Sequence, residues 1–225
     1  MIIVTGASRG LGRAICERLQ LHGIDVLGLA RSVTELPYRT MQCDVSDHDK
    51  IKRVALEIKK QKWEIHGLIN AAGIASMNLA ITTPTHVAKN IIKTNLLGTI
   101  YCCQLFSPLI IRRKAGSIIN FSTIAVALGL KGESIYVASK AGVEGFSRAF
   151  AREMSDFGVR VNCIAPGPID TNLIKGITKE QISNIVSRQI ITKQFSPDAV
   201  CDLVELLLDP KSNSLSGQVF HVGGA

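Results

Sequence analysis

Short apolar runs alternate with longer helical patterns along this chain of 225 residues, and no other feature restricts its fold as strongly. The runs that predict strands cover residues 2–5, 24–30, 39–43, 65–70, 117–121, 159–165 and 218–222, and the helical patterns cover 11–22, 47–62, 84–113, 134–157 and 197–208. Strands separated by helices predict a mostly parallel sheet. Because such crossovers are right-handed, helices should cover both faces. We therefore expect one α/β domain over residues 1–225 with a doubly wound sheet.

The composition agrees with a folded domain. Apolar residues make up 46% of the chain, which is too high a fraction for a disordered protein. The longest apolar stretch is interrupted by Gln104, Ser107 and Pro108, so we expect no membrane span. The chain opens on a strand pattern without a basic leader, so we expect no secretory signal.

The six cysteines indicate a reducing compartment rather than a disulfide framework. None forms a C-x-x-C pair, and most lie in apolar runs, where a free thiol packs as a small hydrophobic group. No histidine has a partner at metal-ligand spacing, so no metal site is expected. A cytoplasmic location is the simplest interpretation.

The net charge of +8 does not by itself indicate nucleic-acid binding. The densest basic stretch, at residues 50–62, carries Ile51, Val54 and Ile58 at helical spacing, which is typical of a helix with one solvated face. No aromatic stacking platform accompanies the basic residues. Nucleic-acid binding stays a remote alternative, which salt-sensitive binding would reveal.

A glycine-rich turn follows the first predicted strand and opens the first helix. Glycines let a backbone turn tightly and approach a pyrophosphate, and a helix N-terminus presents its amides to the anion. Such a turn also fits an ordinary strand-to-helix connection, but its position after an N-terminal strand favours a dinucleotide site. The candidate cofactor-binding residues here are Gly6, Ser8, Arg9, Gly10, Leu11 and Gly12.

The end of the second predicted strand indicates which dinucleotide is bound. An acidic residue at this position grips the ribose hydroxyls of NAD. The sequence has Arg31 instead, and a guanidinium can pair bidentately with a 2′-phosphate. Arg9 adds a second positive charge. We therefore expect NADP(H) to be preferred over NAD(H).

Tyr136 and Lys140 form the sharpest local signal for catalysis. Four residues apart on a helix, they lie on one face. A phenol with a pKa of about 10 is a poor acid or base at neutral pH, but a nearby ammonium and a cationic nicotinamide favour the phenolate. This pair alone would also fit an amphipathic helix with an exposed lysine.

The pair is accompanied by further motifs in one order. They are the Thr5–Gly12 turn, Asn70-Ala71-Ala72-Gly73, Asn95, Ser122-Thr123, Tyr136 with Lys140, Pro166-Gly167-Pro168-Ile169-Asp170-Thr171, and a C-terminal stretch ending in Gly223-Gly224. With them the chain resembles the short-chain dehydrogenase/reductase family over essentially its whole length, and within it the 3-oxoacyl-carrier-protein reductases. The resemblance implies a single-domain Rossmann fold with seven mostly parallel strands.

The resemblance also implies roles for individual residues. Tyr136 would be the proton donor and acceptor, Lys140 would hold the nicotinamide ribose and lower the pKa of Tyr136, and Asn95 would hold a water that relays protons to Lys140. Further cofactor contacts would come from Asp44, Val45, Asn70, Ala71, Ala72, Gly73, Pro166, Gly167, Ile169 and Thr171.

The chain departs from the family pattern at two positions. The family usually has a serine thirteen residues before the tyrosine, where this chain has Thr123, and Ser122 precedes it. Neighbours on a strand point to opposite sides, so both hydroxyls cannot face the substrate equally. We favour Thr123, because its hydroxyl is in register, and Ser122 stays the alternative. Ala71 stands where the family usually has a second asparagine, which removes an amide from that turn.

These features predict an NADPH-dependent oxidoreductase that moves a hydride between the nicotinamide and a small-molecule carbonyl or alcohol. A 3-oxoacyl thioester and a free ketone or sugar-type compound are both open as substrates. A non-catalytic dinucleotide sensor or scaffold on the same fold is the alternative. The stretch 172–196 lacks a clear strand and could form a substrate lid, and the family resemblance implies a homotetramer or homodimer.

Overall fold

The apolar runs form the strands of one parallel sheet in the computed structural model, which describes residues 1–32, 35–170 and 178–225. The strands are β1 (Ile2–Thr5), β2 (Val26–Ala30), β3 (Arg39–Gln42), β4 (Gly67–Asn70), β5 (Gly116–Phe121), β6 (Val159–Pro166) and β7 (Val219–Val222). Their order is β3-β2-β1-β4-β5-β6-β7, and every neighbouring pair is parallel. The expected seven-stranded sheet is therefore confirmed.

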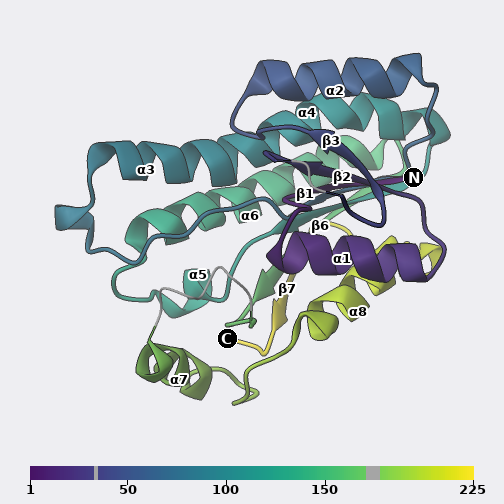
Figure 1. Ribbon diagram of the computed structural model, residues 1–225. Helices are drawn as coiled ribbons and strands as arrows, with labels where there is room; N and C mark the ends of the chain where they lie inside the picture. The colour runs from purple at the N-terminus through teal and green to yellow at the C-terminus, as the bar shows by residue number, and fades with distance from the viewer. Residues whose placement is uncertain (33–34, 171–177) are drawn as a thin grey trace.

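Helices cover both faces of the sheet (Figure 1). On one face lie α1 (Gly10–Leu21) and α8 (Pro197–Leu208), and on the other lie α2 (His48–Lys60), α4 (Gly98–Ile110) and α6 (Ser134–Ser155). This is the doubly wound arrangement that the alternation of strands and helices predicts.

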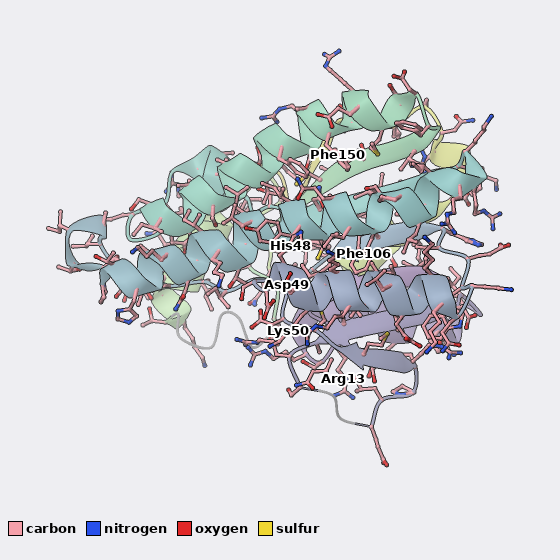
Figure 2. The ribbon with its side chains drawn as sticks, turned by 90° about the horizontal axis from the view of Figure 1, so that it is seen from above. Arg13, His48, Asp49, Lys50, Phe106 and Phe150 are labelled. Carbon is pink, nitrogen blue, oxygen red and sulfur yellow. The ribbon has the colours of Figure 1, made fainter. Side chains whose placement is uncertain are left out.

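The sheet separates two hydrophobic cores. Successive strand residues point to opposite faces, so Ile3 packs with the core beneath α2, α4 and α6, whereas Val4 packs with the core beneath α1 and α8. Phe106 and Phe150, which Figure 2 labels on α4 and α6, belong to the first core. Both side chains are buried in this structure.

The helical pattern at residues 84–113 forms one long helix of four consecutive parts. They are α3 (Thr85–Ile91), a π-helical turn (Ile92–Leu97), α4 and a 3-10 turn (Ile111–Arg113). In the described part of the chain, this is the one helix long and apolar enough to cross a membrane by length and composition alone. It packs against α2, α6 and strands β4 and β5, which is the position of a core helix.

The described part of the stretch expected as a lid consists of one helix followed by an irregular segment. Helix α7 (Lys179–Ser187) begins with a capping box between Thr178 and Gln181, and Phe195 forms a single parallel bridge with Ile169. Thr171 and the rest of residues 171–177 lie outside the described residues. Among the described residues, the remaining short elements are α5 (Ala125–Leu128) and two 3-10 turns, Ala80–Thr82 and Pro210–Ser212.

Candidate active site

A cleft of about 880 Å³ opens at the carboxyl ends of the strands. From β1 the strand order continues to β2 on one side and to β4 on the other, so the direction in which the chain moves across the sheet reverses at β1. Parallel sheets of this kind bind ligands at such a reversal point. The sequence-predicted residues that line it are Gly6, Ser8, Arg9, Gly10, Leu11, Gly12, Arg31, Asp44, Val45, Ala71, Ala72, Gly73, Thr123, Tyr136, Lys140, Pro166, Gly167 and Ile169. Asn70 and Asn95 lie behind this lining.

The glycine-rich turn is shaped to receive an anion. Gly6 and Gly10 have φ angles of 72° and 58°, a backbone region that favours glycine. A Cβ on Gly12 would overlap the Gly6 carbonyl oxygen, so the close packing of helix on strand requires glycine there. Arg9 begins α1 without a side-chain cap, and the amides of the first turn stay open to a ligand. These features fit the pyrophosphate of a dinucleotide.

Tyr38 supports this turn from below, which sequence patterns did not indicate. Its hydroxyl donates to the Ala7 carbonyl oxygen at 2.7 Å, and its ring fills the space beside Gly28. The contact joins residues 31 positions apart. A local pattern cannot reveal such a contact, and the only signal is a tyrosine just before a strand.

Charged residues gather at the β2 end of the cleft. Arg9 and Arg31 line it together, and they can offer two guanidinium groups to a phosphate. The Asp44 carboxylate accepts hydrogen bonds from the Ser46 amide at 2.9 Å and from the Ser46 hydroxyl at 2.8 Å. Asp44 therefore shapes its own turn, and Val45 beside it forms part of the wall.

Asn70 faces the core rather than the cleft. Its amide donates to Asn120 Oδ1 at 2.8 Å, so its side chain joins β4 to β5. The turn that follows it does reach the cleft, and the Ala72 amide donates to Thr5 Oγ1 at 3.0 Å. This hydrogen bond joins the turn after β4 to the glycine-rich turn, although Ala71 carries no amide side chain that could add a second one.

Asn95 lies on the π-helical turn, and its side chain is fully buried. Its side chain donates to the Ile74 carbonyl oxygen and accepts from the Ile74 amide, both at 2.9 Å, and it donates to Ser139 Oγ at 3.1 Å. The main-chain carbonyl of Asn95 accepts from the Thr99 hydroxyl at 2.8 Å. The expected water-holding role therefore stays a prediction, because these contacts describe a group that fixes the chain beside Lys140.

Burial dominates the acid–base state of Tyr136, which is 8% exposed. Burial raises the pKa of its phenol, the negative charge of Glu133 adds to the rise, and a hydrogen bond with Thr123 opposes it. Lys140 Nζ donates to the Phe121 carbonyl oxygen at 2.7 Å, and burial lowers the pKa of its ammonium to about 8. In the chain alone desolvation is the largest cause of the Tyr136 pKa shift, and Lys140 is not among its causes, so the expected lowering by Lys140 stays a prediction.

The two neighbouring hydroxyls after β5 point to different partners. Ser122 Oγ donates to the buried carboxylate of Glu144 at 2.6 Å, which turns it toward α6. Thr123 Oγ1 accepts from the Ala125 amide at 3.2 Å and interacts with the Tyr136 phenol. The geometry favours Thr123 as the hydroxyl that meets a substrate at Tyr136.

The turn at Pro166-Gly167 closes the far end of the cleft. The Gly167 amide donates to the Val222 carbonyl oxygen at 3.1 Å, and the Pro166 carbonyl accepts from the Ile124 amide at 3.0 Å. Gln189 packs so tightly against Gly167 that a Cβ there would overlap its side-chain oxygen. A side chain at position 167 would therefore require the Gln189 side chain to move.

Comparison with known proteins identifies the family. A sequence model described as enoyl-(acyl carrier protein) reductase matches residues 6–224. The 3-oxoacyl-[acyl-carrier-protein] reductase FabG of Staphylococcus epidermidis is 33% identical, over 99% of this chain and 96% of that protein. The chain belongs to the short-chain dehydrogenase/reductase family. This confirms the resemblance, and the chain is accordingly an NAD(P)-dependent oxidoreductase acting on C=O/CH–OH groups.

Further relatives agree with this assignment. FabG of Staphylococcus aureus is 34% identical over the same share of both chains. The aldohexose dehydrogenase of Thermoplasma acidophilum superposes with a TM-score of 0.90 at 30% identity, covering 99% of this chain and 92% of that one. ElxO, solved with NADP bound, gives a TM-score of 0.89 at 26% identity, covering 98% and 96%.

Proposed function

We propose that this short-chain dehydrogenase/reductase is an NADPH-dependent reductase of a small-molecule carbonyl. The observation that carries the proposal is the meeting of Thr123, Tyr136 and Lys140 in the same cleft as the glycine-rich turn. A pure dinucleotide sensor would need the turn but not the buried phenol and lysine. When bound, the nicotinamide would supply the hydride.

The residues of the chain would supply the proton and the geometry. The buried phenol of Tyr136 stays protonated at neutral pH and would donate to the oxygen of the carbonyl being reduced. Thr123 would hydrogen-bond the same oxygen as negative charge develops on it. Lys140 would hold the nicotinamide ribose, and Ile169 and Thr171 would contact the carboxamide.

The choice of NADPH rests on the two guanidinium groups at the β2 end of the cleft. Arg9 and Arg31 would pair with the 2′-phosphate, which NADH lacks. Asp44 and Val45 would then border the adenine, and Ala71, Ala72 and Gly73 would line the adenosine side. ElxO was solved with NADP bound, which supports the same choice here.

The substrate would be a ketone or a 3-oxoacyl compound. The names of the FabG relatives favour a 3-oxoacyl thioester, and that of the aldohexose dehydrogenase favours a hydroxylated compound. We further propose a cytoplasmic enzyme, which six free and buried cysteines support. Enzymes of this family are generally oligomeric, and we propose a homodimer or homotetramer, which sedimentation would distinguish.

The test is NADPH consumption by the purified protein over a panel of ketones, hydroxyketones and 3-oxoacyl thioesters. Turnover of one class, lost in Tyr136→Phe while NADPH still binds, is the expected result. Tight NADPH binding without turnover on any member would contradict the reductase and favour the sensor.

A further inference from the structure

Glu133 lies in the cleft beside the proposed proton donor. It ends a turn in which Gly129 and Gly132 have φ angles of 60° and 86°, and it directly precedes α6. Its side chain is 8% exposed and lines the cleft together with Thr123 and Tyr136. The structure shows no side-chain hydrogen bond of Glu133 at the start of α6, so the carboxylate does not cap that helix.

The lining of the cleft that contains this carboxylate includes the apolar side chains of Ile124, Leu130 and Ile182. Among the described residues no lysine or arginine forms an ion pair with Glu133. Burial accordingly raises its pKa. A carboxylate in such a place is stabilised by any ligand that brings it a hydrogen-bond donor.

Glu133 also lies near the reacting position, because it stands three residues before Tyr136 at the start of α6 and both residues line the cleft. Its negative charge is accordingly the second cause of the raised pKa of Tyr136. The other charged groups of the described lining are directed elsewhere, since Lys140 donates to the Phe121 carbonyl, and Arg9, Arg31 and Asp44 lie at the β2 end. A substrate whose carbonyl oxygen meets Tyr136 therefore has its neighbouring atoms within reach of Glu133.

We propose that Glu133 selects the substrate by accepting a hydrogen bond from a hydroxyl group next to the reacting carbonyl. This inference rests on the proposed reductase function and deepens it. The preferred substrates are hydroxyketones and related polyol-derived carbonyls. A 3-oxoacyl thioester carries no hydrogen-bond donor next to its ketone, so it would leave the carboxylate desolvated without a partner.

The experiment compares 1-hydroxy-2-butanone, 2-butanone and an acetoacetyl thioester with wild type and Glu133→Gln. Glu153→Gln, an exposed change on α6, the helix that Glu133 precedes, is the matched control. We expect wild type to prefer the hydroxyketone over 2-butanone in kcat/KM by about tenfold or more, since sites built for a hydroxyl reject analogues that lack it. Glu133→Gln should reduce that ratio severalfold, while NADPH affinity and the control stay unchanged.

A second readout reports the charge itself. Because Glu133 raises the pKa of Tyr136, Glu133→Gln should shift the basic limb of the kcat/KM profile to lower pH. An unchanged substrate ratio in Glu133→Gln, or a wild-type preference for the thioester, would overturn the inference and leave the reductase standing. If no substrate turns over while NADPH binds, the reductase fails, and calorimetry with the hydroxyketone decides the inference. Weaker binding to Glu133→Gln supports it, and equal binding or none overturns it.

Discussion

At the scale of single residues, the cleft removes two polar side chains, Lys140 and Tyr136, from water. Lys140 is 5% exposed and keeps one hydrogen bond, to the Phe121 carbonyl. Tyr136 is buried beside it and stays neutral. The buried ammonium of Lys140 therefore lowers the free energy of unfolding. This effect is measurable because it depends on pH.

We predict that Lys140→Met abolishes turnover but stabilises the fold at neutral pH. Burial lowers the pKa of Lys140 to about 8 from an unfolded value near 10.5, so its ammonium disfavours the folded state below pH 8. The variant should unfold with a free energy about 2 kcal/mol higher at pH 7, after allowing for the lost hydrogen bond.

The sign of the pH dependence is fixed by the same shift. Between pH 8 and 10.5 the unfolded chain binds the proton that the folded chain has released, so the Lys140 contribution to wild-type stability rises with pH. The stability gap between variant and wild type should close over that window in urea titrations. A gap that stays constant would contradict the assigned pKa.

The hydroxyl pair after β5 gives a second residue-scale prediction. Thr123→Ala should lower kcat about 10²-fold by removing a donor to the developing oxyanion, and Thr123→Ser should keep most activity. Ser122→Ala should keep turnover but lower stability by about 1–3 kcal/mol, because the buried Glu144 carboxylate loses its donor. Steady-state kinetics on all three variants checks this, and the opposite pattern would make Ser122 the catalytic hydroxyl.

At the scale of elements, α1 and α8 are joined by an ion cluster at their surface. Arg18 bonds Asp198 at 2.6 Å, Asp202 at 2.8 Å and Glu205 at 3.4 Å. We predict that Arg18→Met lowers the midpoint temperature of unfolding in low salt, since the three acidic residues then repel one another. The difference should shrink in 1 M NaCl, where the Debye length falls to about 3 Å, and an effect independent of salt would indicate lost packing instead.

The sequence predicted elements well wherever periodicity is set locally. The helix pattern at 197–208 coincides with α8, and the first apolar run coincides with β1. The π-helical turn around Asn95 was not predictable, because it depends on bonds to Ile74 and Ser139 from other parts of the chain. Helix α7 was not predicted, because the apolar and basic residues of the stretch 172–196 fit a lid and a packed helix equally.

The same distinction holds for the site. Motif spacing identified Tyr136, Lys140 and Thr123, which fall on one cleft because the carboxyl ends of parallel strands meet at one edge. The inward turn of Asn70, the raised pKa of Tyr136 and the support from Tyr38 all depend on burial and on long-range contacts. Those properties arise only when the chain is folded.

At the scale of the whole molecule, we predict that the native protein resists thiol reagents. All six cysteines are free and buried, and burial raises the pKa of Cys43 and Cys163 to about 12. Titration with a chromogenic disulfide should label almost none before denaturation and six after it. Rapid labelling of a native thiol would show that part of the core opens.

Because the two cores lie on opposite sides of the sheet, a substitution in one core should have little effect on packing in the other. Phe106 packs on the face of α4 and α6, and Leu19 packs on the face of α1 and α8, with a backbone layer between them. The decreases in the free energy of unfolding caused by Phe106→Leu and by Leu19→Val should therefore add to within about 0.5 kcal/mol in the double variant. Stabilising substitutions could then be combined in the core beneath α1 and α8 without changing the packing around Tyr136 and Glu133.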